Sequence, residues 1–288
     1  QFLDNNFSHK KLKSIESKRI DIILCIYLWD IIDYIGKNIN DDKKYFTHQG
    51  KLSSNSRFFE RNSKKLINSQ NILIGKVEIQ PNVVLDATSG PIIIDDNVTI
   101  KSNTHLEGPL YVGNGSTISP LSYVKNSVIG SMCKIGGEIN SVVIEGYTNK
   151  VHYGFLGNSY IGEWVNFGAG TTNSNLKNNY GKVQVQMNDE VFETNRIHLG
   201  CFIGDYVKTS IGTKINTGSV YGPGSMIFSK DFPSKNIPIL TWYTDSGMSR
   251  VDIDKFILNC HRMKKRRGVD FDIVEEQFYR NLFLKVEK

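Results

Sequence analysis

Mostly apolar residues recur every six positions through the middle of the chain. One series joins Ile94, Ile100, Leu106, Val112, Ile118 and Val124, and another joins Ile197, Ile203, Thr209, Ile215, Tyr221 and Ile227. Two shorter series join Ile129 to Ile135, and Phe155 to Ile161 and Phe167. A period of six matches neither the helical repeat of about 3.6 residues nor the alternation of a two-sided strand. It predicts short strands separated by corners and stacked in parallel, which is a β-solenoid.

Small or β-branched residues often stand four places after these anchors, where they would pack beside the anchor inside the coil. They are Val98, Thr104, Ser116, Ser122, Cys133, Ser159, Val165, Thr171, Cys201, Val207, Thr213, Ser219 and Ser225. Glycine or aspartate often follows the anchor, and glycine permits the backbone conformation of a corner. Because each coil is stabilised mainly by its neighbours, the two ends of such a solenoid need caps.

The pattern changes on both sides of the repeat. Ile22, Ile26 and Trp29 fit a short helix, although the same apolar run fits a buried strand. Further on, residues 251–263 fit an amphipathic helix that stops at Gly268, and a second helix is expected after Asp270. The predicted fold class is mainly β, with small flanking segments. Residues 1–70 form a mixed module and linker, 71–232 the solenoid and 233–288 a helical extension.

The composition agrees with a β-rich chain. Alanine occurs twice, whereas asparagine occurs 27 times and glycine 25 times, and the latter two favour turns over helices. The longest apolar run has eight residues, and a membrane-spanning helix needs about 20, so we expect no membrane partner. The four cysteines lie far apart, which argues against a zinc site or a disulfide framework and favours the cytoplasm.

The net charge of +6 is spread unevenly. Residues 71–249 carry 12 Lys and Arg against 14 Asp and Glu, so the main surface lacks the basic stripe of a nucleic-acid-binding protein. One basic cluster stands out at residues 261–267. We interpret it as the solvated last turns of a helix, where cations suit the negative end of the helix dipole.

Two stretches of the repeat resemble a known family. They are Gly136-Gly137-Glu138-Ile139-Asn140 and the segment from Ser141 to Gly181, which reads SVVIEGYTNKVHYGFLGNSYIGEWVNFGAGTTNSNLKNNYG. Both are similar to the hexapeptide-repeat acyltransferases, whose coils form a left-handed parallel β-helix. More closely, the chain resembles a bacterial sugar nucleotidyltransferase-like family. That family is related to the bifunctional glucosamine-1-phosphate N-acetyltransferase and N-acetylglucosamine-1-phosphate uridylyltransferase.

The resemblance implies an acetyl-transfer site. His152 matches the general base, Glu138 a carboxylate that orients its imidazole, and Asn175 an asparagine beside the amine and the thioester. The substrate-binding positions implied in the same way are Asn140, Lys150, Phe155, Asn166 and Lys182. Acetyl-CoA would lie along the outside of the coils, near Asn175 and the corner Gly168-Ala169-Gly170, between the subunits of a homotrimer. No metal is expected, because a thioester is already activated and the enzyme must only position the amine, remove a proton and stabilise an oxyanion.

Four positions depart from the family's pattern. Asn140 stands where a substrate-binding lysine is usual. Phe155 and Leu176 replace tyrosines, and Ser122 lies near the place of a phosphate-binding arginine. Fewer cations at the sugar phosphate would alter the choice of substrate.

The residues around His152 also support predictions of their own. The six-residue period slips by two just before His152, which predicts an insertion at a solenoid corner, where a functional loop would project. Trp164 and Tyr160 are expected to pack on the outer face of the coils rather than to bind a ring. The acidic residues Asp30 and Asp33 are interpreted as solvated helix and turn positions rather than metal ligands.

These observations predict an acetyl-CoA-dependent N-acetyltransferase that acts on an amino-sugar phosphate in nucleotide-sugar and cell-envelope precursor synthesis. One alternative is the C-terminal part of a sugar-1-phosphate nucleotidyltransferase, similar to UDP-N-acetylglucosamine diphosphorylases, whose β-helix mainly assembles the trimer. Residues 1–70 would then be the remnant of a nucleotidyltransferase-like module, although they contain no glycine-rich loop for a triphosphate. Another alternative is a non-catalytic trimeric scaffold.

Overall fold

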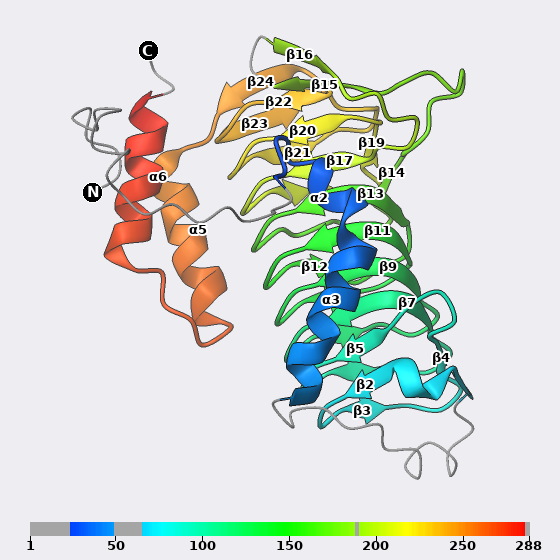
Figure 1. The fold of residues 1–288 in the computed structure, drawn as a ribbon. Coiled ribbons are helices and arrows are strands. Elements are labelled where there is room, and N and C mark those ends of the chain that lie inside the picture. The colour runs from blue at the N-terminus through cyan, green and yellow to red at the C-terminus, as the bar shows by residue number, and fades with distance from the viewer. Residues whose placement is uncertain (1–23, 49–64, 188–189, 286–288) are drawn as a thin grey trace, which may run out of the picture.

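The computed structural model describes residues 24–48, 65–187 and 190–285. Their strands stack in parallel into a β-solenoid, as the repeat predicts (Figure 1). The coils present three faces, which we number in chain order. The long strands β7, β9, β11 and β13 each turn from face 1 to face 2 at their middle, and in the last three the turn contains a residue with positive φ, such as Ser141.

The bounds of the strands follow the three faces. Face 1 contains β1 (Lys65–Ile67), β4 (Val84–Asp86), the first halves of β7 (His105–Val112), β9 (Tyr123–Ile129), β11 (Glu138–Ile144) and β13 (Phe155–Ile161), then β14 (Thr172–Asn173) and β19 (Lys214–Ile215). Face 2 contains β2 (Ile72–Ile74), β5 (Ile92–Ile94), the second halves of the long strands, β17 (Cys201–Ile203), β20 (Ser219–Tyr221) and β22 (Asn236–Ile237). Face 3 contains β3 (Glu78–Ile79), β6 (Thr99–Ile100), β8 (Thr117–Ile118), β10 (Lys134–Ile135), β12 (Asn149–Lys150), β18 (Lys208–Thr209), β21 (Met226–Phe228) and β23 (Thr241–Thr244). The strand β24 (Gly247–Arg250) returns antiparallel to β23, and a 3-10 turn, η1 (Ser69–Asn71), precedes β2.

The predicted anchors form the core of the solenoid. All six members of the series from Ile94 to Val124 are fully buried, and every small residue predicted beside an anchor is buried too. Two anchors are wrong. Ile197 is 47% exposed because it lies in the long loop between β14 and β17. Phe155 is only half-buried, because the next residue, Leu156, fills the core position.

The expected insertion next to His152 is also wrong. Four residues, 151–154, join β12 to β13, and four residues likewise join β6 to β7 and β8 to β9. The slip in the period comes from the previous coil, where only Gly136 and Gly137 join β10 to β11. The corner at 151–154 is therefore of ordinary length. It stacks on the unusually tight corner Gly136-Gly137 of the coil before it.

Two short helices cover face 2. They are α2 (Asp30–Asp33) and α3 (Ile35–His48), and α3 runs across the strands (Figure 1). Trp29, Ile35 and Ile39 pack on the outward apolar side chains of face 2, together with the hairpin β15 (Gln184–Met187) and β16 (Glu190–Glu193). The sequence allowed either a helix or a buried strand for the apolar run that ends at Trp29, and the structure has a helix that begins just after it. Ile22 lies outside the described residues.

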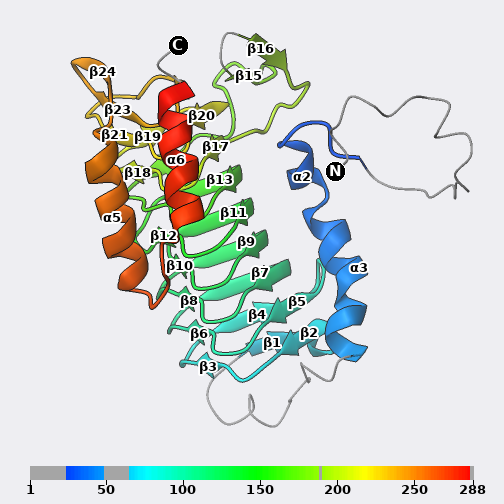
Figure 2. The same cartoon turned by 90° about the vertical axis from the view of Figure 1, so that its left-hand side faces the viewer.

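The two predicted C-terminal helices are confirmed as α5 (Ile253–Lys265) and α6 (Ile273–Lys285). The side chain of Asp252 caps α5 by accepting hydrogen bonds from two backbone N–H groups. Both helices lie across the solenoid from α2 and α3 (Figure 2). They bury the corner between faces 2 and 3, where Tyr147, Trp164 and Tyr206 stack in successive coils. Trp164 therefore packs on the coils, as predicted.

The strands reach beyond residues 71–232 on both sides, from Lys65 to Arg250. The last parallel pairings join β20 to β22 and β21 to β23, so the solenoid continues to Thr244, and the antiparallel strand β24 leads from it to α5. Within the described ranges, the structure contains no helix long and apolar enough to span a membrane.

Candidate active site at an exposed corner

His152 lies at the corner between face 3 and face 1, in the segment 151–154 that we call the His152 corner. His152 and Tyr153 are exposed there. Gly154 has a φ of +119°, and a Cβ at this position would lie 2.2 Å from the carbonyl oxygen of Thr171 in the next coil. The corner is thus held tightly between its neighbours while its side chains project outward. Such a placement presents an imidazole to a bound molecule.

Lys150 is placed differently from its sequence-based prediction. Its side chain is only 3% exposed and fills the core position that Ile135 and Phe167 fill in the coils on either side. The Nζ atom donates hydrogen bonds to the carbonyl oxygens of Gly136, His152 and Gly154, at 3.0, 3.1 and 2.9 Å. Burial lowers the pKa of this amine to about 8. This placement does not agree with a substrate-binding role, because the amino group is already bonded on the inside of the His152 corner.

Three predicted residues lie on the outside of face 1, beside the His152 corner. Glu138 and Phe155 are partners in the ladder between β11 and β13, and Asn140 is the partner of Gly157 in the same ladder. Glu138 is exposed, and no hydrogen bond joins its carboxylate to His152 within the described part of the chain. The structure therefore brings the two groups to one corner without bonding them.

Asn175 joins this set from the end of the next coil. Its Nδ2 donates to Oδ1 of Asn158 at 2.6 Å. Gly157 leaves the room for this arrangement, since a Cβ there would lie 2.3 Å from the ring of Phe155 and 3.1 Å from Nδ2 of Asn175. Phe155 and Asn175 thus share the space above one glycine.

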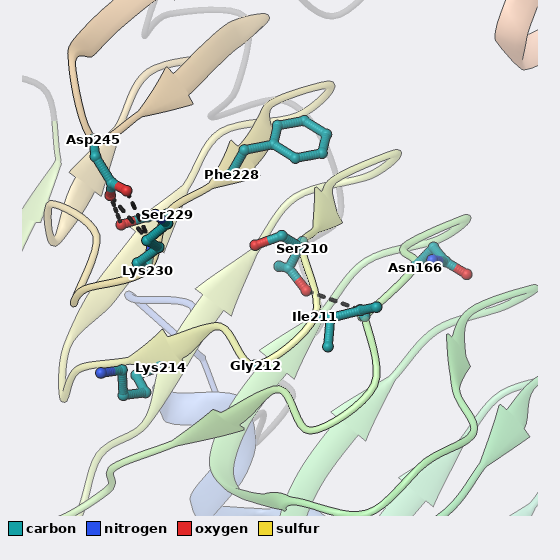
Figure 3. A pocket seen from close by; sticks show the side chains of 11 residues that line it. Asn166, Ser210, Ile211, Gly212, Lys214, Phe228, Ser229, Lys230 and Asp245 are labelled. Carbon is teal, nitrogen blue, oxygen red and sulfur yellow. Dashed lines mark hydrogen bonds between the residues drawn. The ribbon is translucent and has the colours of Figure 1, made fainter.

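An open groove of about 1000 Å³ begins one coil beyond the His152 corner (Figure 3). Asn166 and Gly168 line one end, and Lys214, Phe228 and Lys230 lie further along. Gly170 lies below Tyr153, because a Cβ on it would come within 2.8 Å of the phenol oxygen. Among the described residues that line the groove, Asp245 is the one carboxylate. Its pKa is lowered because Ser229 and the backbone N–H of Lys230 donate hydrogen bonds to it.

Lys182 is the predicted site residue that lies apart. It follows β14 in the long loop, is exposed, and donates from Nζ to Oδ1 of Asn195 at 2.9 Å. The structure thus places Glu138, Asn140 and Phe155 on face 1, with His152 at the corner before it and Asn175 at its far edge. Asn166 and Gly168 lie in the next coil, and Lys150 lies inside the solenoid. Among the described residues, no group of three or more His, Cys, Asp or Glu is arranged to hold a metal ion.

The proteins of known sequence that this chain resembles include several bifunctional enzymes. The bifunctional sugar-1-phosphate nucleotidylyltransferase/acetyltransferase of Sulfurisphaera tokodaii is 38% identical over 168 residues, which is 57% of this chain and 40% of that protein. The bifunctional protein GlmU of Thermodesulfovibrio yellowstonii is 31% identical over 150 residues, covering 51% of this chain and 30% of GlmU. The GlmU of Clostridium acetobutylicum is 35% identical over 117 residues, covering 39% and 25%. No protein-family model matches the sequence.

The solenoid is a distant homologue of the β-helix half of GlmU-type bifunctional enzymes. The chain spans less than half the length of each of these relatives. The resemblance seen in the sequence is therefore confirmed for the fold and the ancestry of the coils.

This GlmU-like solenoid has a second pocket that the sequence did not predict. It measures about 540 Å³ and lies between face 3 and α5. Arg262, Arg266 and Arg267 line it, and the first two are exposed at the end of α5, as the interpretation of residues 261–267 expects. That interpretation is wrong for Lys264, which is buried. The available signal was the spacing of Arg262 and Arg266 by four, which places them on one face of a helix. What they face could not be read from that spacing.

Proposed function

We propose that this chain is an acetyl-CoA-dependent N-acetyltransferase of an amino-sugar phosphate and that it works as a homotrimer. The observation that carries the proposal is the placement of His152 at an exposed corner beside face 1, one coil from a long open groove. Glu138 lies on face 1, and Asn175 lies at its far edge, where it bonds Asn158. Homology to proteins named as acetyltransferases supports this chemistry. The substrate class comes from the resemblance around His152.

In this proposal His152 accepts the proton of the attacking amine. A positioned base next to an activated thioester supplies most of the machinery that acyl transfer needs. Asn175 offers an amide that can hold the amine or the thioester carbonyl, and its Nδ2 is oriented by Asn158. Glu138 lies on the same face and would orient the imidazole once a substrate fills the corner. Apo geometry at such sites is often looser than in the complex.

The groove that starts at Asn166 suits the cofactor. Ile211 and Phe228 give it apolar surface for the pantetheine arm, while Lys214 and Lys230 supply positive charge for phosphate groups. Acetyl-CoA bound there would bring its thioester toward the His152 corner. The cofactor supplies the activated acetyl group, and the chain's own residues position the amine and remove its proton.

A second subunit is expected to complete the site. Leu121, Tyr153 and Ile211 are between 75% and 80% exposed and lie in different coils at the corner between faces 3 and 1. Exposed apolar side chains that gather along one edge are typical of an interface between subunits. In the described structure, α2, α3, α5 and α6 all pack elsewhere, so a neighbouring copy can reach this edge.

The decisive experiment is a thiol assay together with a pyrophosphate assay on the same sample. With acetyl-CoA and amino-sugar phosphates, the chain should release free thiol. With nucleoside triphosphates and sugar phosphates, it should release no pyrophosphate. His152→Ala should lower turnover by about 10²–10⁴-fold, whereas His261→Ala, on the exposed side of α5, should leave it unchanged. Pyrophosphate release without thiol release would favour the nucleotidyltransferase alternative, and silence in both assays would favour the scaffold.

A further inference from the structure

The second pocket is formed where α5 lies over the outside of face 3. Asn149, Asn166 and Lys208 occupy equivalent outward positions in three successive coils, joined by parallel bridges. Successive coils lie about 4.8 Å apart, so these side chains form a polar column. We call the space between this column and α5 the basic pocket. It shares Asn166 with the groove proposed for acetyl-CoA.

Four cations line the basic pocket, namely Lys208, Arg262, Arg266 and Arg267. None of the described residues that line it is a carboxylate, so no lining residue placed by the structure balances these charges. Burial lowers the pKa of Lys208, which means that its ammonium group is partly withdrawn from water. A desolvated cation without an anion nearby is costly, and a bound anion would remove that cost.

The end of α5 is held in place over face 3. Arg267 donates from Nη2 to Oδ1 of Asn149 at 2.9 Å. Lys264 is buried, forms an ion pair with Glu275 and lies over the ring of Trp164. These contacts fix the helix, so Arg262 and Arg266 are presented to the pocket by a rigid element. They are not simply the frayed end of a helix.

We propose that the basic pocket binds the phosphate group of a phosphorylated small molecule. Guanidinium groups match phosphate oxygens with paired hydrogen bonds, and an ammonium group adds a compact point charge. The volume of about 540 Å³ accommodates a phosphate together with a sugar or a nucleoside part, and Trp242 offers a ring against which such a part can rest. That this phosphate belongs to a reactant bound in the adjoining groove rests on the proposed function, but phosphate binding itself does not.

Binding is tested by calorimetry on the intact chain without acetyl-CoA, so an inactive protein still gives an answer. The probes are inorganic pyrophosphate, glucosamine 1-phosphate and adenosine 3′,5′-bisphosphate. At least one should bind, and Lys208→Gln or Arg266→Gln should raise its Kd about tenfold. Lys265→Gln is the matched control, because Lys265 is an exposed neighbour on α5 that does not line the pocket.

The three probes identify the source of the phosphate. Tight binding of glucosamine 1-phosphate points to the acceptor substrate, and tight binding of the bisphosphate points to the nucleotide end of CoA. Trp164 and Trp242 line the pocket, so bound ligand should also change tryptophan fluorescence. Arg266→Gln changes an exposed side chain and keeps the test valid if Lys208→Gln fails to fold. Equal losses with all three variants, or no binding of any probe, would overturn the proposal.

Discussion

The amino group of Lys150 donates a hydrogen bond of 3.1 Å to the main-chain carbonyl of His152. An interior lysine thus holds the backbone of the residue proposed as general base, while the imidazole itself faces outward. The same amine also bonds Gly136 and Gly154, so it ties together two consecutive corners. An ammonium group has three donors, and here it meets three carbonyl acceptors. The core of the solenoid therefore supports the candidate site directly.

Replacing this lysine with an apolar side chain should damage stability and the site together. Lys150→Met fills the core position but leaves three carbonyl groups without their donor. We expect a loss of about 1–3 kcal/mol in the free energy of unfolding, measured by urea denaturation, and a lower rate of acetyl transfer. Lys101→Met, at an exposed position, is the control and should change neither. A variant as stable and active as the wild type would show that these bonds do not hold the corner.

The burial of Lys150 predicts that the free energy of unfolding depends on pH. Burial lowers the pKa of Lys150 to about 8 from its ordinary 10.5. Below pH 8 the amine is protonated in both the folded and the unfolded chain. Between the two values the unfolded chain binds more protons, so the contribution of Lys150 to stability rises with pH. The difference in unfolding free energy between wild type and Lys150→Met should therefore be larger at pH 10 than at pH 7, and a constant difference would contradict the shift.

The N-terminal cover depends on a long-range ion pair. Arg196, in the long loop, bonds both Asp30 and Asp33 of α2, with a distance of 3.0 Å to Asp30. Arg196→Gln should cost about 1 kcal/mol and should speed hydrogen exchange in α2 and α3. Lys37→Gln removes the solvent-exposed pair with Asp41 on α3 and is expected to leave exchange unchanged. If the two variants behave alike, the ion pair does not anchor the cover.

The sequence predicts those features that depend on spacing alone. The six-residue period identifies the core positions, and the small residues beside them are all buried, because each coil repeats the same environment. The helices α5 and α6 follow equally well from their own apolar spacing and from Gly268. The gathering of His152, Glu138 and Phe155 follows from the stacking of coils, since positions about one coil apart must be neighbours.

Other features depend on contacts that spacing does not encode. Lys150 occupies a core position. A prediction from the hydrophobic pattern assigns a lysine to the surface instead. The buried amine of Lys150 is satisfied by three main-chain carbonyls, one of which belongs to Gly136 in the tight corner of the coil before it. Arg196 pairs with Asp30, and Lys208 faces α5 across the basic pocket. Both contacts join segments that are far apart in the chain. These required the tertiary structure.

The space above Gly157 gives a direct test of the face 1 half of the site. In Gly157→Ala, the new methyl group would lie 2.3 Å from the ring of Phe155, so the ring must turn away and release the surface beside Asn175. We expect kcat/KM for acetyl transfer to fall about ten- to a hundredfold with little change in melting temperature. Gly146→Ala is the control, because its methyl group would likewise crowd a side chain, lying 2.9 Å from the carboxylate of Glu163, but at another corner. Equal activity of the two variants would exclude Phe155 and Asn175 from the site.

The exposed edge at the corner between faces 3 and 1 predicts how the subunits meet. Ile211 is 80% exposed there and lines the groove proposed for acetyl-CoA. Ile211→Glu would place a carboxylate in an apolar contact, which is costly without a partner, so the variant should shift from trimer to monomer in light scattering at micromolar concentration. Ile273→Glu, at an exposed isoleucine that begins α6, should leave the mass unchanged. Because the site is expected to be shared between subunits, Ile211→Glu should also lose thiol release at low protein concentration and regain it as concentration rises. A variant that stays trimeric would place the interface elsewhere, and a wild-type chain that is monomeric would remove the shared site altogether.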